Sequence, residues 1–382
     1  MKCTGRDGAT GDSIELTFST SILDAAPLPP PERSGAWLSP GWIDIQVNGF
    51  AGVDYCSPAT SVEEIARSIQ ALFSTGVTRF YPTVITGSAE IMAGALRNLA
   101  RARSTLAAGR AMEGFHVEGP HISPEDGPRG AHPRRSVRPP DVEEFRRWQE
   151  AAEGNVRLVT LAPEWPGATR YIETLTREGV VVSIGHTQAT GAQIRDAVEA
   201  GATLSTHLGN GAHAVLERHP NYIWEQLAED RLTASFIADG IHLPRSFLKV
   251  ALRAKGIERS VLVTDAVMPA MATPGRYRLG EVEVELHADA RVTLVGESKL
   301  AGSSLRMDRG IENLMRLGEI SLGEALTMAT RNPARVGRIA GRQHGLEPGE
   351  RADLVEFLYD PQARSIQVQR TWVDGELVYQ AR

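Results

Sequence analysis

Eight short apolar segments alternate with longer amphipathic segments over most of the chain, and this alternation is the feature that most restricts the fold. The apolar segments have the length and the β-branched content of buried strands. We expect strands at residues 42–47, 78–82, 114–118, 157–162, 180–186, 202–207, 233–238 and 260–264. Parallel strands that are buried on both faces read as continuous apolar runs, and eight of them between helices predict an α/β fold, the (β/α)8 TIM-type barrel.

The segments between these strands repeat their apolar residues every three or four positions, which is typical of helices packed on a sheet. We expect helices at residues 61–74, 88–107, 142–152, 169–178, 192–200 and 245–255, and again at 305–317 and 322–334. Residues 274–300 instead alternate with the period of two that is typical of strands. They predict a β insert that could cover a site as a lid.

The two ends of the chain contain further strand patterns. Residues 13–18 alternate weakly, and a proline-rich run over 27–35 reads as a stiff linker. Near the other end, residues 354–357 and 371–378 read as strands, the second with an Asp-Gly hairpin turn. Neither end is large enough to enclose a core alone. We therefore predict a small β-sandwich built from residues 1–40 and 346–382, and a barrel over residues 41–345 with the insert at about 274–300.

Composition excludes several classes of protein. Hydrophobic residues make up 42% and charged residues 23% of the chain, as in ordinary globular proteins. The formal net charge of -6 and the lack of a long basic run argue against a nucleic-acid surface. No apolar stretch reaches membrane-spanning length, and residues 1–6 lack the apolar core of a signal peptide, so we expect a cytoplasmic protein. Cys3 and Cys56 are too few for a disulfide framework and lack metal-site spacing.

Residues suited to metal binding and proton transfer stand at the ends of four predicted strands. Glu118, His186 and His207 end the third, fifth and sixth strands, and Asp265 ends the eighth. The carboxyl ends of barrel strands meet at one face, where barrel enzymes place their chemistry. One carboxylate and two imidazoles suit a zinc-like divalent ion with an open position for water. An aspartate beside that water supplies the proton acceptor and donor that hydrolysis needs.

Each of these residues also has a plainer explanation when taken alone. A strand-end histidine is commonly a packing residue, Glu118 could form an ion pair at its strand end, and Asp265 could cap a helix. His116 shares the strand face of Glu118 but lies earlier, so we expect it to pack below the site. The conjunction of suitable residues at four strand ends favours a metal-dependent hydrolase.

Several motifs resemble those of a known superfamily. Pro40-Gly41-Trp42-Ile43-Asp44, the strand ends at His186, His207 and Asp265, and Pro348-Gly349-Glu350-Arg351-Ala352-Asp353-Leu354 resemble the amidohydrolase superfamily. Within it, the chain from Pro40 onward resembles the N-acetylglucosamine-6-phosphate deacetylase family. The motifs that carry this second resemblance are Gln46-Val47-Asn48-Gly49, Gly114-Phe115-His116-Val117-Glu118-Gly119-Pro120, Gly130-Ala131-His132-Pro133, Gly185-His186-Thr187-Gln188-Ala189-Thr190, Thr206-His207-Leu208, Ile237-Ala238-Asp239-Gly240-Ile241-His242 and Leu262-Val263-Thr264-Asp265-Ala266.

The resemblance implies roles for individual residues. It implies Glu118, His186 and His207 as metal ligands and Asp265 as general acid and base. Many superfamily members hold a second metal with His-x-His after the first strand. The chain has Gln46 and Asn48 there, so one divalent ion per subunit is implied, zinc in first place, with iron, manganese or cobalt possible.

The same resemblance implies the substrate contacts and the assembly. His132 is expected at the sugar or the reacting carbonyl, and Asn48 is assigned to the substrate site as well. Asn210, the Gly211 backbone, Arg218 and His242 are expected at the phosphate, with Arg218 reaching across the interface of a homodimer. The implied reaction is hydrolysis of the acetamide of an amino sugar, in first place N-acetylglucosamine 6-phosphate.

The chain departs from the family pattern in two places, residues 209–220 and the insert at 277–300, and both concern the choice of substrate. His213 and His219 are additional imidazoles in the first of these segments, and we expect His219 to be a surface residue.

Two different functions stay open from the sequence. One is an amidohydrolase for another substrate, such as an unphosphorylated sugar, an N-acyl-D-amino acid or a cyclic amide. The second is a non-catalytic protein that keeps the barrel as a scaffold.

Overall fold

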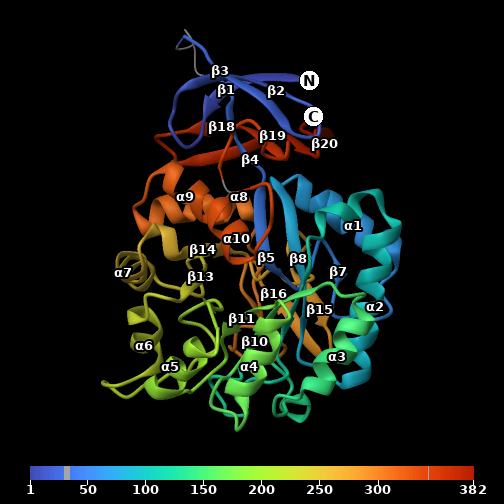
Figure 1. Ribbon diagram of the computed structural model, residues 1–382, viewed down its shortest axis with the longest axis vertical. Helices are drawn as coiled ribbons and strands as arrows, with labels where there is room; N and C mark the ends of the chain where they lie inside the picture. Colours follow the sequence, from blue (N-terminus) through green and yellow to red (C-terminus); the bar gives the residue numbers. More distant parts are fainter. Residues whose placement is uncertain (30–34, 343) are drawn as a thin grey trace.

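Eight parallel strands form the barrel that the alternation predicts (Figure 1). Their spatial order is β14-β13-β12-β11-β10-β9-β8-β5. The ring closes between its first and last members, because the Asp265 N–H donates to the Gln46 carbonyl (3.0 Å) and the Asn48 N–H donates to the Ala266 carbonyl (2.7 Å). The strands are β5 (Trp42–Val47), β8 (Val77–Ile85), β9 (Phe115–Glu118), β10 (Val156–Leu161), β11 (Val181–Ile184), β12 (Leu204–Ser205), β13 (Thr233–Ile237) and β14 (Ser260–Val263).

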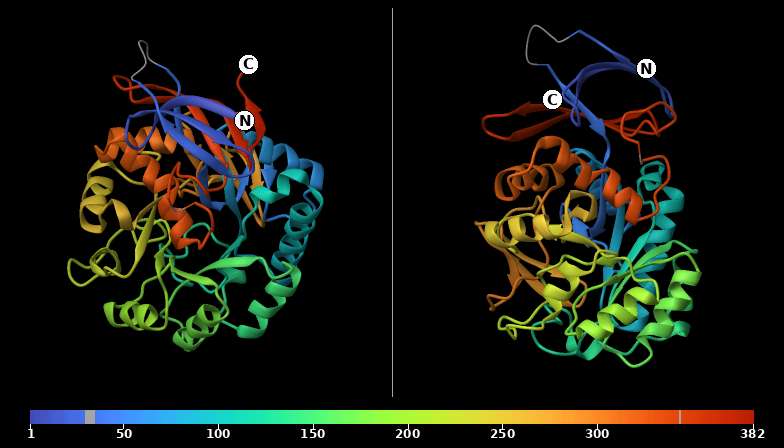
Figure 2. Two further views of the ribbon diagram at one scale, coloured as in Figure 1. Left: turned by 45° about the horizontal axis from the view of Figure 1, so that its top comes forward. Right: turned by 60° about the vertical axis from the view of Figure 1, so that its left-hand side comes forward.

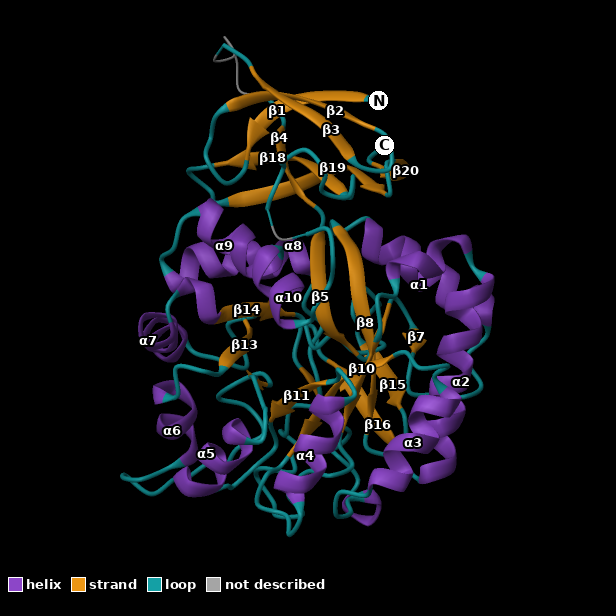
Figure 3. Cartoon of the chain, in the orientation of Figure 1, coloured by secondary structure: helices purple, strands orange, loops and turns teal. Residues whose placement is uncertain are grey.

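The computed structural model describes residues 1–29, 35–342 and 344–382, so most of the proline-rich linker predicted over 27–35 lies outside the described residues. Helices cover the outside of the barrel (Figure 3). They are α1 (Val62–Phe73), α2 (Ala89–Thr105), α3 (Val142–Ala151), α4 (Ala168–Arg177), α5 (Gly191–Glu199), α6 (Tyr222–Ala228), α7 (Arg245–Lys255), α8 (Met307–Asn313), α9 (Leu322–Ala329) and α10 (Arg331–Val336). None of the described helices is long and apolar enough to cross a membrane.

Several of the described helices begin at a residue whose side chain caps the N-terminus. At α1 the Ser61 hydroxyl accepts the Glu64 N–H (3.2 Å) while the Glu64 carboxylate accepts the Ser61 N–H (2.9 Å). The short helix α6 was not among the predicted helices, and its N-terminus is capped by the Asn221 side chain. The helix predicted over 322–334 is divided at Thr330, which leaves the helical conformation with φ -129° and ψ -79°.

Strands from both ends of the chain form a second sheet, in the order β20-β19-β18-β4-β1-β2-β3 (Figure 2). Phe18 of β2 packs edge-on against Trp372 of β19 with 5.9 Å between ring centroids, although three strands separate β2 from β19 in this order. The sheet therefore bends over itself and encloses its own core. Its strands are β1 (Lys2–Asp7), β2 (Ser13–Phe18), β3 (Ile22–Pro27), β4 (Trp37–Pro40), β18 (Leu354–Asp360), β19 (Ser365–Val373) and β20 (Glu376–Gln380). The division into domains at residues 40/41 and 345/346 stays a prediction.

A buried ion-pair network fixes this terminal sheet to the barrel. Arg79 of β8 is fully buried, and its Nε lies 2.8 Å from the equally buried Asp353 carboxylate, just before β18. The buried Arg342 pairs with the same carboxylate. Buried charges are stable only with such partners, which gives a structural reason for the Asp of the Pro348–Leu354 motif.

The β insert predicted after the eighth strand forms a three-stranded antiparallel sheet. It consists of β15 (Gly275–Leu279), β16 (Val282–Leu286) and β17 (Val292–Leu294). Leu279 and Val282 of this sheet line the pocket described below, so the insert forms one wall of that pocket. Two short strands after β5, β6 (Gly49–Phe50) and β7 (Val53–Asp54), pair with each other.

Candidate active site

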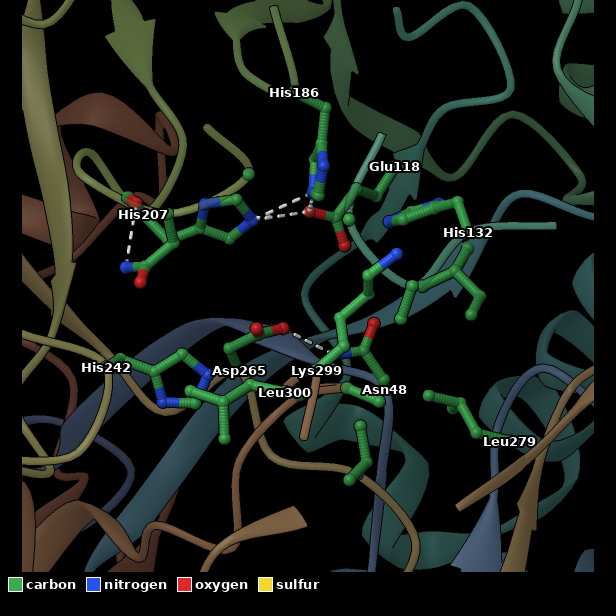
Figure 4. Close-up of a pocket in the computed structure, with 18 of the residues that line it drawn as sticks. Asn48, Glu118, His132, His186, His207, His242, Asp265, Leu279, Lys299 and Leu300 are labelled. Carbon is green, nitrogen blue, oxygen red and sulfur yellow. Dashed lines mark hydrogen bonds and ion pairs between the residues drawn. The ribbon is translucent and has the colours of Figure 1, made fainter. Parts of the chain in front are cut away.

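A pocket of about 540 Å³ lies at the carboxyl ends of the barrel strands. The pocket is lined by residues at the ends of β8 and β9 and by residues that follow β5, β11, β12, β13 and β14, together with the loop at 126–132 and the insert. Figure 4 shows Glu118, His186, His207 and Asp265 converging on this pocket. The predicted site residues that line it are Asn48, Glu118, His132, His186, His207, Asn210, Gly211, His242 and Asp265.

Glu118, His186 and His207 form a compact cluster whose ligand atoms all lie within 4.8 Å of one another. Glu118 Oε1 is 3.2 Å from His186 Nε2 and 2.9 Å from His207 Nε2, and the two Nε2 atoms are 3.1 Å apart. Two ligands that share a tetrahedral zinc-like ion are separated by roughly 3.4 Å. The three atoms therefore have the chemistry and nearly the spacing of a metal site with one open position.

The backbone carbonyl of Pro128 orients one imidazole of this cluster. His186 Nδ1 lies 2.8 Å from that carbonyl, which can only accept a hydrogen bond, so Nδ1 carries the proton. The lone pair of Nε2 is then directed at the cluster, as metal ligation requires. His207 Nδ1 is buried and has no hydrogen-bond partner among the described residues.

The carboxylate of Glu118 is kept ionised by the two histidines. Burial alone would raise the pKa of Glu118, but its contacts with His186 and His207 hold it well below its usual range. Conversely, the pKa of His207 is raised, because the contact with Glu118 outweighs the effect of burial. An ionised carboxylate beside two imidazoles is a charge distribution that attracts a cation.

Asp265 faces the same pocket and is held by two side-chain amides. Asn48 Nδ2 donates to Asp265 Oδ1 (2.7 Å), and Gln46 Nε2 lies 3.2 Å from the same oxygen and 3.0 Å from Glu118 Oε1. Gln46 thus links the Asp265 carboxylate to the metal-site carboxylate. Burial, together with the negative charge of Glu118, raises the pKa of Asp265 to about 6. A carboxyl group with that pKa can both accept and return a proton near neutral pH.

His186, His207 and Asp265 share an unusual backbone conformation, with φ values of 51°, 31° and 50°. Residues with a Cβ rarely adopt positive φ, and such strain concentrates at functional sites. In each case the residue follows the last hydrogen-bonded residue of its strand closely, so the turn directs its side chain into the pocket. This conformation also explains why β12 ends at Ser205 rather than at residue 207 as predicted.

His132 lies against the metal-site cluster. Its ring packs edge-on against that of His186 with 4.4 Å between centroids, and its Nδ1 is 2.8 Å from Thr86 Oγ1. Burial and the neighbouring His186 lower the pKa of His132 to about 3, so this imidazole is neutral at physiological pH. His116, which we expected below the site, lies between Thr83 and Thr160 and outside the cluster.

Of the residues that the resemblance places at the phosphate, only some line the pocket. Asn210, Gly211 and His242 line the pocket, and His242 Nδ1 is 2.6 Å from Asp239 Oδ2. Arg218 is exposed and does not line the pocket of its own chain. Gly211 has φ of 55°, and a Cβ there would lie 2.7 Å from His186 Nδ1, so only glycine allows the loop to pass so near the cluster.

The two additional histidines of the diverged loop do not line the pocket. His213 Nδ1 lies 3.0 Å from the Tyr222 hydroxyl, and His219 is exposed. The pocket does contain a residue that no sequence pattern singles out, Lys299, from the end of the insert. A lysine in a diverged segment is normally a surface residue, so only its position in space distinguishes it.

Comparison with known proteins agrees with this geometry. The sequence profile of the amidohydrolase family matches residues 37–378. The chain is 33% identical to N-acetylgalactosamine-6-phosphate deacetylase of Escherichia coli O157:H7 over 96% of this chain and 95% of that protein. It is 36% identical to human N-acetylglucosamine-6-phosphate deacetylase over 91% of this chain and 84% of the relative.

Solved structures give the same result. The crystal structure of N-acetyl-D-glucosamine-6-phosphate deacetylase from Mycobacterium smegmatis superposes with a TM-score of 0.87 at 30% identity, covering 98% of both chains. That of the Thermotoga maritima N-acetylglucosamine-6-phosphate deacetylase superposes with a TM-score of 0.86 at 26% identity, covering 100% of both. The chain is therefore a metal-dependent amidohydrolase and belongs to the N-acetylglucosamine-6-phosphate deacetylase family.

Proposed function

We propose that this enzyme hydrolyses the acetamide group of N-acetylglucosamine 6-phosphate and releases acetate and glucosamine 6-phosphate. One observation carries the proposal: Asp265, held by Asn48 and Gln46, faces the same pocket as the Glu118, His186 and His207 cluster. A cation site and a proton-transfer group on one face are what amide hydrolysis requires.

We propose one divalent ion per subunit, held by Glu118, His186 and His207. Zinc fits a donor set of one carboxylate and two imidazoles, and iron, manganese and cobalt can take its place. When bound, such an ion lowers the pKa of a water molecule and polarises a carbonyl group. Gln46 and Asn48 are occupied with Asp265 and offer amide groups where a second ion would need imidazoles, which supports a single ion.

Asp265 has the central role in the proposed chemistry. Its carboxylate accepts the proton of the attacking water and then delivers it to the nitrogen of the departing amine. Asn48 and Gln46 fix one oxygen of the carboxylate and leave the second oxygen for this transfer. Neutral His132, whose Nδ1 is occupied by Thr86, is proposed to contact the reacting carbonyl through Nε2.

The remaining substrate contacts and the assembly are also proposals. Asn48, Asn210, Gly211 and His242 line the pocket and are proposed to bind the sugar phosphate. Arg218 is exposed outside the pocket of its own chain, so it can contribute only if a partner subunit presents it, as in the proposed homodimer. We further propose that the enzyme acts in the cytoplasm, where phosphorylated sugars are found.

A second candidate substrate is the 4-epimer, N-acetylgalactosamine 6-phosphate. The observation that favours it is the 33% identity to N-acetylgalactosamine-6-phosphate deacetylase over 96% of the chain. The diverged loop at 209–220 and the insert, both next to the pocket, leave room for either epimer to be preferred. Neither an N-acyl-D-amino acid as substrate nor a scaffold without activity gains support from the family comparison.

The test is an assay of acetate release by zinc-reconstituted protein. The substrates are N-acetylglucosamine 6-phosphate, N-acetylgalactosamine 6-phosphate and the two sugars without phosphate. We expect the highest kcat/KM for N-acetylglucosamine 6-phosphate. A higher value for the epimer would select the second candidate, and failure to hydrolyse any of the four would refute an amino-sugar deacetylase.

A further inference from the structure

A chain of polar side chains links several strands inside the barrel. His116 Nε2 lies 2.7 Å from Thr160 Oγ1, Thr160 Oγ1 lies 2.7 Å from Thr206 Oγ1, and Thr206 Oγ1 lies 2.5 Å from Ser183 Oγ. At the other end of the chain, His116 Nδ1 lies 3.4 Å from Thr83 Oγ1. All five side chains are buried, and we call these five residues the polar belt.

Three members of the polar belt stand just before the three proposed metal ligands in the sequence. His116 lies two residues before Glu118, Ser183 lies three residues before His186, and Thr206 lies directly before His207. Because side chains two residues apart in a strand leave it on the same face, His116 and Glu118 both point into the barrel from β9. The polar belt therefore occupies the layer of the barrel interior beneath the metal-site cluster.

Gly185 shows how closely the polar belt supports one of these ligands. This residue directly precedes His186, and a Cβ at its position would lie 2.8 Å from Thr160 Cγ2 and 2.9 Å from Thr206 Cβ. The backbone that leads to His186 thus rests on two threonines whose hydroxyl groups are hydrogen-bonded to each other. Thr160 also pairs in register with Glu118, the last residue of β9. A shift of either threonine would therefore be passed to the ligands.

His207 depends on hydroxyl groups because the ladder of its own strand ends before it. Strand β12 comprises only Leu204–Ser205, and His207 has the unfavourable φ of 31°. The His207 N–H donates to the Ser235 hydroxyl (2.8 Å), and this hydroxyl donates to the Ser205 carbonyl (3.3 Å). The strained turn is thus held by Ser235 from β13 and by Thr206 from the polar belt.

Stability of the fold does not by itself account for the polar belt. The interior of such a barrel is normally filled by branched apolar side chains. Burying hydroxyl groups costs free energy that their mutual hydrogen bonds roughly offset, so apolar groups of the same shape would stabilise the fold about equally well. Hydrogen bonds differ from apolar contacts in being directional. They can hold ligands within the roughly 0.5 Å that a metal site requires.

We propose that Thr160 and Thr206 are positioning residues that set the geometry of the Glu118, His186 and His207 site and thereby its affinity for a divalent ion. The inference rests on the metal site proposed above and extends it to residues that do not line the pocket. Thr160 and Thr206 act through the Gly185 backbone and through the turn at His207, without contact to the ion or the substrate.

The first test measures zinc affinity by competition with a chromogenic chelator. Thr160→Val and Thr206→Val nearly keep the shape of the side chain but lose its hydrogen bonds to two neighbours. We expect both variants to bind zinc about 10- to 100-fold more weakly than the wild type. Thr206→Ser restores the hydroxyl and should bind zinc within about threefold of the wild type.

Thr371→Val is the matched control for the two valine variants. Thr371 is equally buried, and its hydroxyl donates to the Phe73 carbonyl (2.9 Å) from the terminal sheet, away from the metal-site cluster. The control removes the same group from a buried site and should leave zinc affinity unchanged. A loss of zinc affinity in Thr371→Val equal to that in Thr206→Val would show general destabilisation and overturn the proposal.

The absorption spectrum of cobalt-substituted protein gives a second readout, because its ligand-field bands depend on ligand geometry. The bands of Thr371→Val and Thr206→Ser should coincide with those of the wild type, whereas the bands of Thr206→Val should shift. Wild-type zinc affinity and cobalt bands in both valine variants would overturn the proposal, as would a failure of Thr206→Ser to recover zinc binding.

Ser183→Ala decides the matter if the valine variants do not fold, since it removes only the terminal link of the polar belt. We expect weaker zinc binding in this variant, and unchanged binding would overturn the proposal. Metal binding is measured without substrate, so the outcome does not depend on which amide the enzyme hydrolyses. Wild-type protein that binds zinc but releases no acetate would refute the proposed reaction and leave this test intact.

Discussion

Replacing Asp265 by asparagine should separate catalysis from structure. Asparagine keeps an oxygen that can accept from Asn48 Nδ2 (2.7 Å) and from Gln46, so the side chain keeps its place. It cannot accept or return a proton. Loss of a positioned acid–base group slows such reactions by about 10²- to 10⁴-fold. That corresponds to roughly 2.7–5.5 kcal/mol of barrier.

The same substitution should stabilise the metal-free protein. Burial and Glu118 raise the pKa of Asp265 from its ordinary value of 3.8 to about 6. The folded protein therefore binds this proton more tightly than the unfolded chain, and the resulting stability is complete below pH 3.8 and lost as the pH rises through about 6. At pH 7 the wild type folds around a disfavoured carboxylate that Asp265→Asn lacks.

Two assays test these expectations. Acetate release by zinc-loaded protein should fall as stated, with zinc content near that of wild type. Thermal unfolding of metal-free protein at pH 7 should show a higher midpoint for Asp265→Asn, and the difference should vanish near pH 4. Asp126→Asn removes an exposed carboxylate from the pocket rim and should change neither readout. Turnover within tenfold of wild type, or loss of zinc, would refute the proton-transfer role.

Three further predictions concern the metal site and the scaffold. Removal of the metal with a chelator should abolish acetate release, and added zinc should restore it; activity that survives exhaustive chelation would contradict a metal-dependent reaction. Gly211→Ala should displace His186 and lower the affinity for zinc. In the control Gly154→Ala, φ is also positive but the space around the added Cβ is open, so the substitution should lower the stability of the fold by about 1 kcal/mol and leave zinc binding intact. Equal zinc affinity in the two variants would argue against the clash. Asp353→Asn removes the carboxylate that two buried guanidinium groups share, so that Arg342 loses its ion pair and Arg79 keeps only those with Glu113 and Asp374. It should lower the free energy of unfolding by about 3–5 kcal/mol in urea titrations, while the exposed Asp289→Asn should have little effect. Similar stabilities of the two variants would show that the buried network is not needed.

The sequence predicts the barrel and the cation cluster because both follow from strand periodicity. Once eight parallel strands are recognised, their carboxyl ends must meet at one face, so Glu118, His186 and His207 could be brought together without any structure. The strained turns that aim the two histidines could not be predicted, since positive φ in a residue with a Cβ runs against local preference.

Segments outside this periodicity were harder to predict. The helix at Tyr222–Ala228 is too short for its apolar spacing to be distinctive, and the inward position of Lys299 depends on hydrogen bonds between the insert and the strand end at Asp265. The pairing order of the terminal strands could not be predicted from the sequence either, because alternation shows that a segment is a strand but does not identify the strand beside it. The parallel pair of β1 and β4 is one example.

The seven-stranded terminal sheet has a consequence for how the protein is made on the ribosome. Strand β4 lies between β1, which precedes it, and β18, which begins at Leu354. During synthesis the first 40 residues leave the ribosome long before β18 exists, so one edge of β4 has no partner while the entire barrel is translated. The buried carboxylate of Asp353, which holds Arg79 and Arg342, also arrives at that late point. Of the three carboxylates around Arg79, only Glu113 precedes the end of the barrel, since Asp353 and Asp374 follow it. Pausing or truncation before residue 353 would therefore leave nascent chains with an open edge of β4, with Arg79 paired to Glu113 alone, and with Arg342 without its counter-charge.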